Sequence, residues 1–255
     1  AMTLFTSRPV GDAMATTIWG TSSSWTLTAL PLFVWMGEIL FRTKLSENLF
    51  EGLSPWMQKL PGGLIHVNIV GCALFAAISG SSAATVATVG KMSIPELRKR
   101  NYPEKILLGS LAGSGTLGLL IPPSIILIIY GVTVQESIAK LFVAGIIPGI
   151  MIALIFMGYV ILWSLLNKRD MPIILKRYSF VDKIKKSKKL IPVILLIVSV
   201  IGSIYTGVAT ATEAASLGVV GSLILSFFQK SLNWNTFRNS LLGATITSCM
   251  ISFIL

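Results

Sequence analysis

Long apolar stretches, separated by short and mostly basic connections, leave this chain few possible folds. A helix needs ~20 apolar residues to cross the core of a bilayer, and most of these stretches approach or exceed that length. Of the 255 residues, 53% are hydrophobic and only 12% are charged, too few charges to cover the surface of a soluble domain. The sequence therefore predicts an all-α polytopic membrane protein. The predicted membrane elements are residues 24–41, 64–92, 105–130, 139–166, 190–208 and 213–229, followed by the start of a further, truncated helix at 240–255.

The positions of the charges predict an orientation. The formal net charge is +11, but the basic residues cluster between the apolar stretches, as they do in cytoplasmic loops. This distribution argues against nucleic-acid binding. Nine Lys and Arg residues between 168 and 189 assign the connection 167–189 to the cytoplasm. Alternate crossings then place the N-terminal segment 1–23 on the extracytoplasmic side.

The stretch 64–92 does not fit a simple crossing. Basic residues flank it on both sides, Lys59 before it and Lys91 and Arg98 at and after its end, so both flanks favour the cytoplasm. We therefore expect a re-entrant hairpin whose tip lies near 79–82. Arms of about a dozen residues would reach ~18–20 Å into a ~30 Å hydrocarbon core. One ordinary helix that breaks the charge rule is the alternative.

Residues 42–63 are too polar to cross a membrane, but they carry apolar side chains near helical spacing. We expect an interfacial amphipathic helix along the cytoplasmic surface, with Trp56 at headgroup depth and Lys59 in water. An ordinary soluble loop is the alternative.

The stretch 105–130 is built to break within the membrane. Pro122 and Pro123 remove two backbone donors and leave upstream carbonyls without helical partners. Hydrocarbon cannot satisfy those carbonyls, so such a backbone occurs only where it is buried in protein or lines a polar cavity. Secondary transporters use broken helices of this kind to bind ions and substrates near the midplane. A proline kink that serves only packing is the alternative.

The ionisable side chains offer little for catalysis. His66 has no acid or nucleophile at a telling spacing, and we expect it at a surface or interface. Glu38 and Arg42 predict an i,i+4 ion pair, and Glu213 predicts a carboxylate that caps its helix through a nearby threonine. Neither of the two cysteines has a metal-ligand spacing. The sequence therefore predicts no enzyme activity and no organic cofactor.

Four motifs follow one another between about Leu30 and about Leu225: SGSS, GTLGLLIPPS, LFVAGIIPG and T-x-TEAA. In this order they resemble the large membrane subunit of TRAP (tripartite ATP-independent periplasmic) transporters. The resemblance implies an elevator-type fold of the ion-transporter superfamily, with inverted repeats that each hold a re-entrant hairpin and a broken transmembrane helix. It implies Na⁺-coupled import of carboxylate solutes, such as C4-dicarboxylates or sialic acid, across the bacterial inner (cytoplasmic) membrane. The implied partners are a small four-helix membrane subunit and a periplasmic substrate-binding protein.

Carried over by motif, the implied ion site lies between the hairpin tip and the broken segment. Carbonyls and hydroxyls from these two elements suit a hard cation such as Na⁺. The implied Na⁺-binding residues are Ser79, Gly80, Ser81, Ser82, Gly115, Thr116, Gly118 and Pro122. The implied substrate-binding residues are Ser82, Thr85, Pro123 and Ser124.

Members of that family are much longer, so we expect this chain to be a fragment that holds one half of the transport site. No arginine lies within a predicted membrane core, so carboxylate recognition is expected from helix N-termini, hydroxyls or the missing half. Two other functions stay open. A stand-alone sodium/dicarboxylate symporter of the same superfamily would need no binding protein, and a channel or non-transporting membrane scaffold would show no Na⁺-dependent uptake.

Overall fold

The computed structural model describes residues 10–43, 45–172 and 179–254, and every regular element within these ranges is helical. In chain order they are α2 (Val10–Ser22), η1 (Trp25–Thr28), α3 (Ala29–Phe41), α4 (Leu45–Met57), α5 (Ile65–Ser79), α6 (Ser82–Lys99), α7 (Glu104–Gly115), η2 (Thr116–Leu119), α8 (Ile125–Val134), α9 (Ile138–Leu166), η3 (Lys168–Asp170), α10 (Phe180–Ser187), α11 (Ile191–Tyr205), α12 (Ala211–Phe228) and α13 (Trp234–Ile254).

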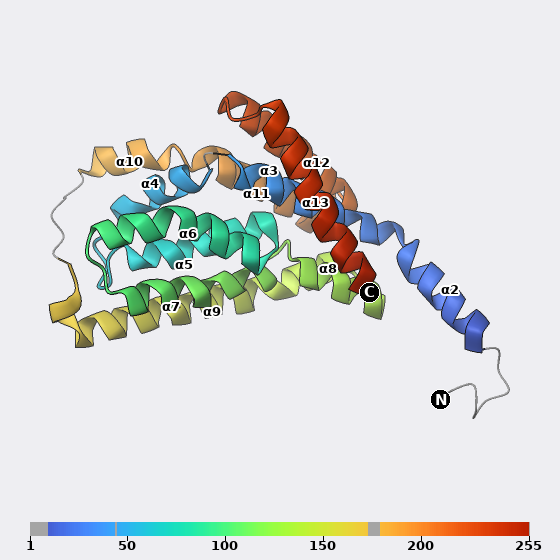
Figure 1. The fold of residues 1–255 in the computed structure, drawn as a ribbon, viewed down its shortest axis with the longest axis horizontal. Coiled ribbons are helices and arrows are strands. Elements are labelled where there is room, and N and C mark those ends of the chain that lie inside the picture. The colour runs from blue at the N-terminus through green and yellow to red at the C-terminus, as the bar shows by residue number, and fades with distance from the viewer. Residues whose placement is uncertain (1–9, 44, 173–178, 255) are drawn as a thin grey trace.

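The helices form two groups (Figure 1). In the first group, α5 lies at the centre and packs against α4, α6, α7 and α9. In the second, α3 packs against α12 and α13, and α11 packs against α12. The two groups meet where α3 contacts α5 and α8.

Two helices of the described chain, α9 and α12, are individually long and apolar enough to cross a membrane, and up to four spans result if each of two bent pairs counts as one. One bent pair joins α10 to α11 through a 54° angle. The helices α5 and α8 are apolar but shorter. These helices fit a multi-pass membrane protein.

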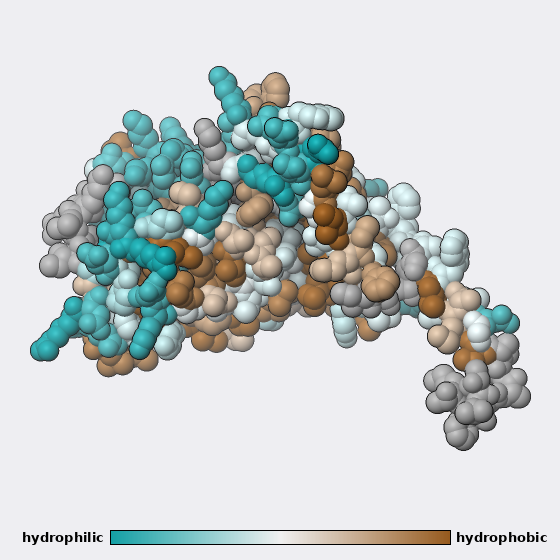
Figure 2. All heavy atoms as spheres, in the orientation of Figure 1, coloured by the Kyte–Doolittle hydropathy of each residue, from teal (hydrophilic) through white to brown (hydrophobic). Residues whose placement is uncertain are grey.

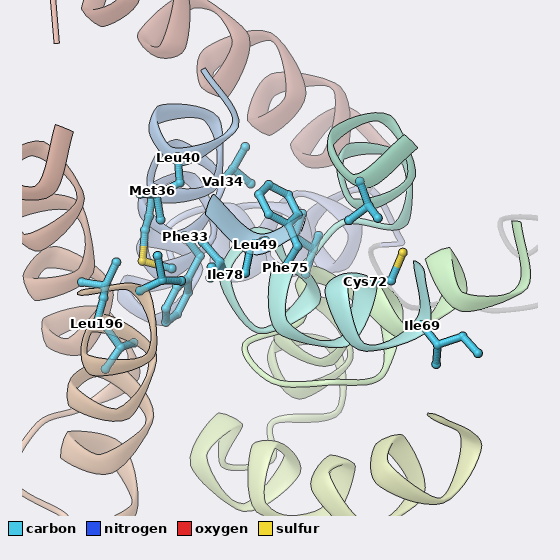
Figure 3. Packing of buried hydrophobic residues seen from close by; sticks show 14 of the residues in the cluster. Phe33, Val34, Met36, Leu40, Leu49, Ile69, Cys72, Phe75, Ile78 and Leu196 are labelled. Atoms are coloured by element: carbon cyan, nitrogen blue, oxygen red, sulfur yellow. The ribbon is translucent and has the colours of Figure 1, made fainter. Parts of the chain in front are cut away.

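Tight apolar packing joins the two groups at α3 and α5. Phe33, Phe75 and Ile78 are almost completely buried, and Figure 3 shows them close together between these helices. A Cβ placed on Gly37 of α3 would lie 2.9 Å from the Cα of Ser79 at the end of α5. The absence of a side chain at Gly37 therefore lets α3 approach the hairpin tip closely.

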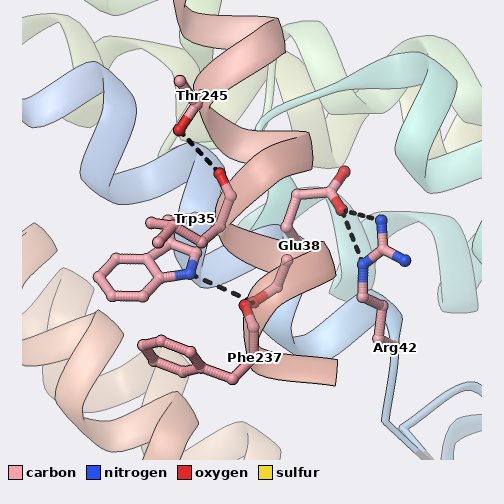
Figure 4. Close-up of polar contacts among 7 residues, drawn as sticks. Trp35, Glu38, Arg42, Phe237 and Thr245 are labelled. Carbon is pink, nitrogen blue, oxygen red and sulfur yellow. Dashed lines mark hydrogen bonds and ion pairs between the residues drawn. The ribbon is translucent and has the colours of Figure 1, made fainter. Parts of the chain in front are cut away.

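Polar contacts hold α3 against α13 (Figure 4). Trp35 donates its indole N–H to the Ser240 hydroxyl at 3.3 Å. The predicted ion pair is confirmed, with the Glu38 carboxylate 3.0 Å from the Arg42 guanidinium. A Cβ on Gly243 would lie 2.7 Å from that carboxylate, so α13 passes directly over the pair.

The amphipathic helix expected in 42–63 is present as α4, but its apolar face covers the protein itself. Leu49, Phe50 and Leu53 are buried in the common core, and α4 packs on α5, α6 and α10. Trp56 is 41% exposed and donates its indole N–H to the Ser187 hydroxyl of α10 at 2.8 Å. Tertiary contacts replace most of the predicted contact between this face and the lipid.

Helices also occupy segments that we expected to be connections. α6 continues to Lys99, past residue 92, and α10 forms within the basic connection 167–189. Within the segment 1–23, residues 10–22 form α2, while residues 1–9 lie outside the described part.

Candidate functional site

The hairpin turns at the predicted tip. α5 ends at Gly80, whose φ of 59° lies in the left-handed region that glycine adopts without strain. Ser81 is extended and caps α6, its hydroxyl accepting from the Ala84 N–H at 3.4 Å. The 15 residues of α5 give that arm a length of ~22 Å, and both outer ends of the hairpin lie at the same end of the molecule (Figure 1).

The chain also breaks between α7 and α8. The short helix η2 ends at Leu119, and residues 120–124 have no regular helical structure before α8 starts at Ile125. The Pro122–Pro123 peptide bond is cis. The Ser124 hydroxyl donates to the Leu119 carbonyl at 2.6 Å, a hydrogen bond that spans the irregular segment.

These two irregular segments touch. The Ile125 N–H, the first of α8, donates to the Gly80 carbonyl at 3.2 Å. A Cβ on Gly118 would lie 2.8 Å from the carbonyl carbon and oxygen of Ser81. A Cβ on Gly80 would lie 2.7 Å from the Pro123 carbonyl oxygen. Backbone therefore meets backbone, and glycines make the contact possible.

Hydroxyls at the tip hold its backbone in place. Ser79 and Thr85 are buried, and their hydroxyl oxygens lie 3.0 Å apart. Thr85 also donates to the Ser81 carbonyl at 2.7 Å. Of the hydroxyls that we proposed for the site, only that of Ser82 makes no hydrogen bond within the described part of the chain.

Three of the proposed residues lie at the edge of this contact. Thr116 is exposed, and its hydroxyl donates to the Gly113 carbonyl of its own helix. Gly115 faces the side chain of Val86 in α6, and Pro122 packs towards α9. The Thr116 hydroxyl is thus already engaged, whereas Gly118, Pro123 and Ser124 lie directly against the tip.

A cavity of about 300 Å³ opens beside the tip. Gly80, Ser81 and Ser82 form one wall, and α8 contributes another through Ile125, Ile126 and Ile129. The third wall comes from α13, and sequence reasoning did not find it; the residues are Thr247, Met250 and Ile251. The cavity is thus mostly apolar, with the hydroxyl-bearing residues Ser81, Ser82 and Thr247 in its lining. Among the described residues, no cluster of His, Cys, Asp or Glu could hold a metal.

Two buried polar residues on α5 were not anticipated. Asn68 donates its amide N–H to the Ser110 hydroxyl at 3.0 Å and to the Leu107 carbonyl at 3.3 Å, which ties the hairpin to α7. His66 is completely buried, with its Nε2 2.7 Å from the Pro61 carbonyl, so the expectation of a surface or interfacial position was wrong. An asparagine inside an apolar run was the available signal for the first of these contacts.

Comparison with known proteins gives one family. The family model "Tripartite ATP-independent periplasmic transporter, DctM component" matches residues 1–255. The chain is 34% identical over 216 residues to a C4-dicarboxylate TRAP transporter large permease protein of Pseudomonas aeruginosa, covering 85% of this chain and 50% of that protein.

Two further relatives carry other substrates in their names. The isethionate TRAP transporter permease protein of Oleidesulfovibrio alaskensis is 34% identical over 251 residues, 96% of this chain and 38% of that protein. The sialic acid TRAP transporter permease protein of Haemophilus influenzae is 34% identical over 235 residues, 91% of this chain and 37% of that protein. The chain thus spans about half or less of the length of these relatives, all of which are named as transporter permeases and not as enzymes.

Proposed function

Because this chain belongs to the DctM component family of tripartite ATP-independent periplasmic transporters, we propose that it is part of a Na⁺-coupled importer of carboxylate solutes. The solutes would be small carboxylates such as the C4-dicarboxylates or sialic acid of the relatives' names. The proposed location is the bacterial inner membrane. The proposed partners are a small membrane subunit and a periplasmic substrate-binding protein that delivers the solute.

The observation that carries this proposal is the contact between the hairpin tip and the break. At this contact Gly80 and Pro123 bring their backbones together, and Ser82, whose hydroxyl has no partner in the described chain, lines the adjoining cavity. Carbonyl and hydroxyl oxygens without a thiolate or imidazole suit Na⁺ rather than a transition metal. We therefore assign the coupling ion to this contact and the carboxylate to the adjoining cavity. There the N-terminus of α8 offers partial positive charge to an anion.

We further propose that transport moves the hairpin group against the group of α3, α11, α12 and α13. Support comes from the boundary between the groups, where Gly37 of α3 faces the backbone of Ser79 without a side chain. At that point no side chain stands between the two backbones, whereas the large side chains of Phe33, Phe75 and Ile78 beside it would have to repack during the movement.

The decisive experiment is uptake of labelled carboxylates into proteoliposomes. These contain the full-length permease and its small subunit, with the binding protein outside and an inward Na⁺ gradient present or absent. Uptake that needs both the gradient and the binding protein supports the proposal. Uptake indifferent to the binding protein supports a stand-alone symporter, and ion conductance without substrate supports a channel. An absence of any Na⁺ effect contradicts the ion site.

The same assay locates the ion site through Ser82→Ala. Loss of one oxygen ligand to a charged partner costs about 1.5–3 kcal/mol, so the Na⁺ concentration for half-maximal uptake should rise by about tenfold or more. Ser199→Ala is the matched control, since Ser199 is exposed on α11 and its hydroxyl bonds within its own helix. Equal Na⁺ dependence in both variants would move the site elsewhere.

A further inference from the structure

A cavity of about 610 Å³ lies between α5, α7 and α9, away from the hairpin tip. Gly113 of α7 lies against Phe156 of α9, and Ile121, further along the chain, lies against Gly149, which precedes Phe156 in α9. The chain direction of α7 is therefore antiparallel to that of α9. The start of α7 and the end of α9 therefore share one end of the groove. Lys105 and Trp163 line the groove at this end.

The length of the groove is close to the thickness of one leaflet of the hydrocarbon core. From Lys105 to Gly113 the lining covers eight residue steps of α7, or ~12 Å, compared with ~15 Å for half of a hydrocarbon core. Its floor on α7 is formed by small residues, and a Cβ placed on Gly109 would meet no atom within 4 Å. Ile155 and Phe156 of α9 form an apolar wall.

The outer face of this region is apolar. Only 17% of the most hydrophobic 18-residue stretch of α9 is buried. Exposed side chains such as Leu154, Ile155 and Leu162 project from this helix. Figure 2 shows hydrophobic residues along the lower edge, where Figure 1 places α7 and α9, and hydrophilic residues at the left end. The groove thus runs from an apolar surface to a polar end.

Positive charge gathers at that polar end. Lys105 lines the groove and makes no ion pair within the described residues. The neighbouring carboxylate, that of Glu104, is paired with Arg98. A second cavity of about 300 Å³ adjoins it, since Gly62 of its lining touches Val160 of the groove. Lys59 and Lys168 line that second cavity. No acidic side chain lines either cavity in the described part of the chain.

We propose that this groove binds one anionic phospholipid of the cytoplasmic leaflet. One acyl chain lies along Gly109 and Gly113, and the phosphate is held by Lys105 with Lys59 and Lys168 nearby. A basic pocket between membrane helices at their cytoplasmic ends is the chemistry that anionic headgroups recognise. A soluble anion would gain nothing from the apolar length of the groove, and a neutral lipid would gain nothing from the lysines.

The test uses the full-length permease with its partner subunit, delipidated in mild detergent and titrated with phosphatidylglycerol or phosphatidylcholine. Native mass spectrometry counts the lipids retained. We expect one phosphatidylglycerol to be retained at concentrations where phosphatidylcholine is lost. Lys105→Ala should weaken retention about fivefold, the effect of about one lysine at an anionic membrane surface. Lys140→Ala, a lysine at the start of α9 and thus at its other end, should have no effect.

Gly109→Leu tests the apolar part of the groove, because a leucine there fills space that the acyl chain would occupy. Its control is Gly158→Leu on α9, where a Cβ also meets no atom within 4 Å and the groove lining is not involved. Retention should fall in the first variant only. Equal retention in both glycine variants, or equal retention of both lipids by the unaltered protein, would overturn the proposal.

A photoactivatable phosphatidylglycerol distinguishes a lipid from a protein occupant. Cross-linked peptides from α7 and α9 support the proposal. If a photo-cross-linking residue introduced at Ile155 instead joins this chain to another part of the permease or to the small subunit, protein covers the groove and the proposal fails.

Discussion

Glycines decide the geometry of the candidate site at the scale of single residues. Gly80 supplies a left-handed turn, and Gly118 lets the Ser81 carbonyl approach within van der Waals distance of η2. The atoms that a side chain on Gly118 would meet belong to the backbone of the hairpin tip, which cannot rotate away. The contact is therefore sensitive to volume added at Gly118.

Gly118→Ala tests this sensitivity. The added methyl group should push the hairpin tip away from the break, at a cost of ~1–3 kcal/mol of overpacking. We expect Na⁺-driven uptake in proteoliposomes to fall by about tenfold or more, because the proposed ion ligands would separate. Gly202→Ala on α11 is the control, since a Cβ there meets no atom within 4 Å. Unchanged uptake in Gly118→Ala would show that the close contact is not part of the transport site.

Sequence patterns identified polar residues that lie together at the hairpin tip, but they did not predict the hydrogen bonds of those side chains. Ser79, Ser81 and Thr85 stood out as polar residues in an apolar run, and the structure places them together at the tip. Most of their hydroxyls form hydrogen bonds with the backbone of the tip itself. These bonds depend on the geometry of the turn, which residue types alone do not specify. Thr247 lies more than a hundred residues away in the sequence, so no local pattern links it to the tip.

At the scale of elements, local signals worked well where a helix starts. The predicted cap on α12 is confirmed, with the Glu213 carboxylate accepting from both the N–H and the hydroxyl of Thr210 at 2.8 Å. The Thr210 hydroxyl in turn accepts from the Glu213 N–H at 3.3 Å. This reciprocal capping box gives Glu213 a structural role at the start of α12.

Two substitutions separate capping from proton coupling. Thr210→Val removes the cap and should lower the stability of α12 by about 1 kcal/mol, measured as a lower thermal midpoint of the purified protein. Glu213→Gln keeps an oxygen acceptor for the Thr210 N–H and should retain most of the uptake. Loss of uptake in Glu213→Gln with an unchanged thermal midpoint would instead indicate a proton-coupling carboxylate.

Charge density was a poor guide to where helices end. We expected the hairpin to stop at residue 92, yet α6 continues to Lys99, with Ser93 and Leu97 buried. Similarly, α10 forms in the most basic connection because it packs on α4, where the Lys183 ammonium lies 5.0 Å from the ring centre of Trp56. Tertiary contacts make these polar helices stable, and hydropathy does not report such contacts.

At the scale of the whole molecule, the hairpin makes a prediction about topology. Both of its outer ends lie at the same end of the molecule, next to the connection that the charge rule assigns to the cytoplasm (Figure 1). Lys59→Cys and Lys99→Cys should therefore react with an impermeant maleimide only from the cytoplasmic side. Glu136→Cys, in the connection before α9, should react only from outside.

The exposed Cys249 is first replaced by serine, while Cys72 is buried and can remain. Labelling of Lys59→Cys and Lys99→Cys from opposite sides of the membrane would mean that the segment crosses fully, which contradicts the re-entrant hairpin.

Sequence patterns alone were enough to predict the helical, membrane-embedded class, the family, and the two places where the chain breaks. Each of these depends on local information: runs of apolar residues, prolines and glycines at fixed positions, and motifs in a fixed order. Three features emerged only from the folded chain: the hydrogen bond between Gly80 and Ile125, the packing of α4 over the hairpin, and the wall that α13 adds to the cavity at the tip. Those contacts join segments far apart in the chain, and their free energy depends on how surfaces fit together, which residue types and spacing leave open.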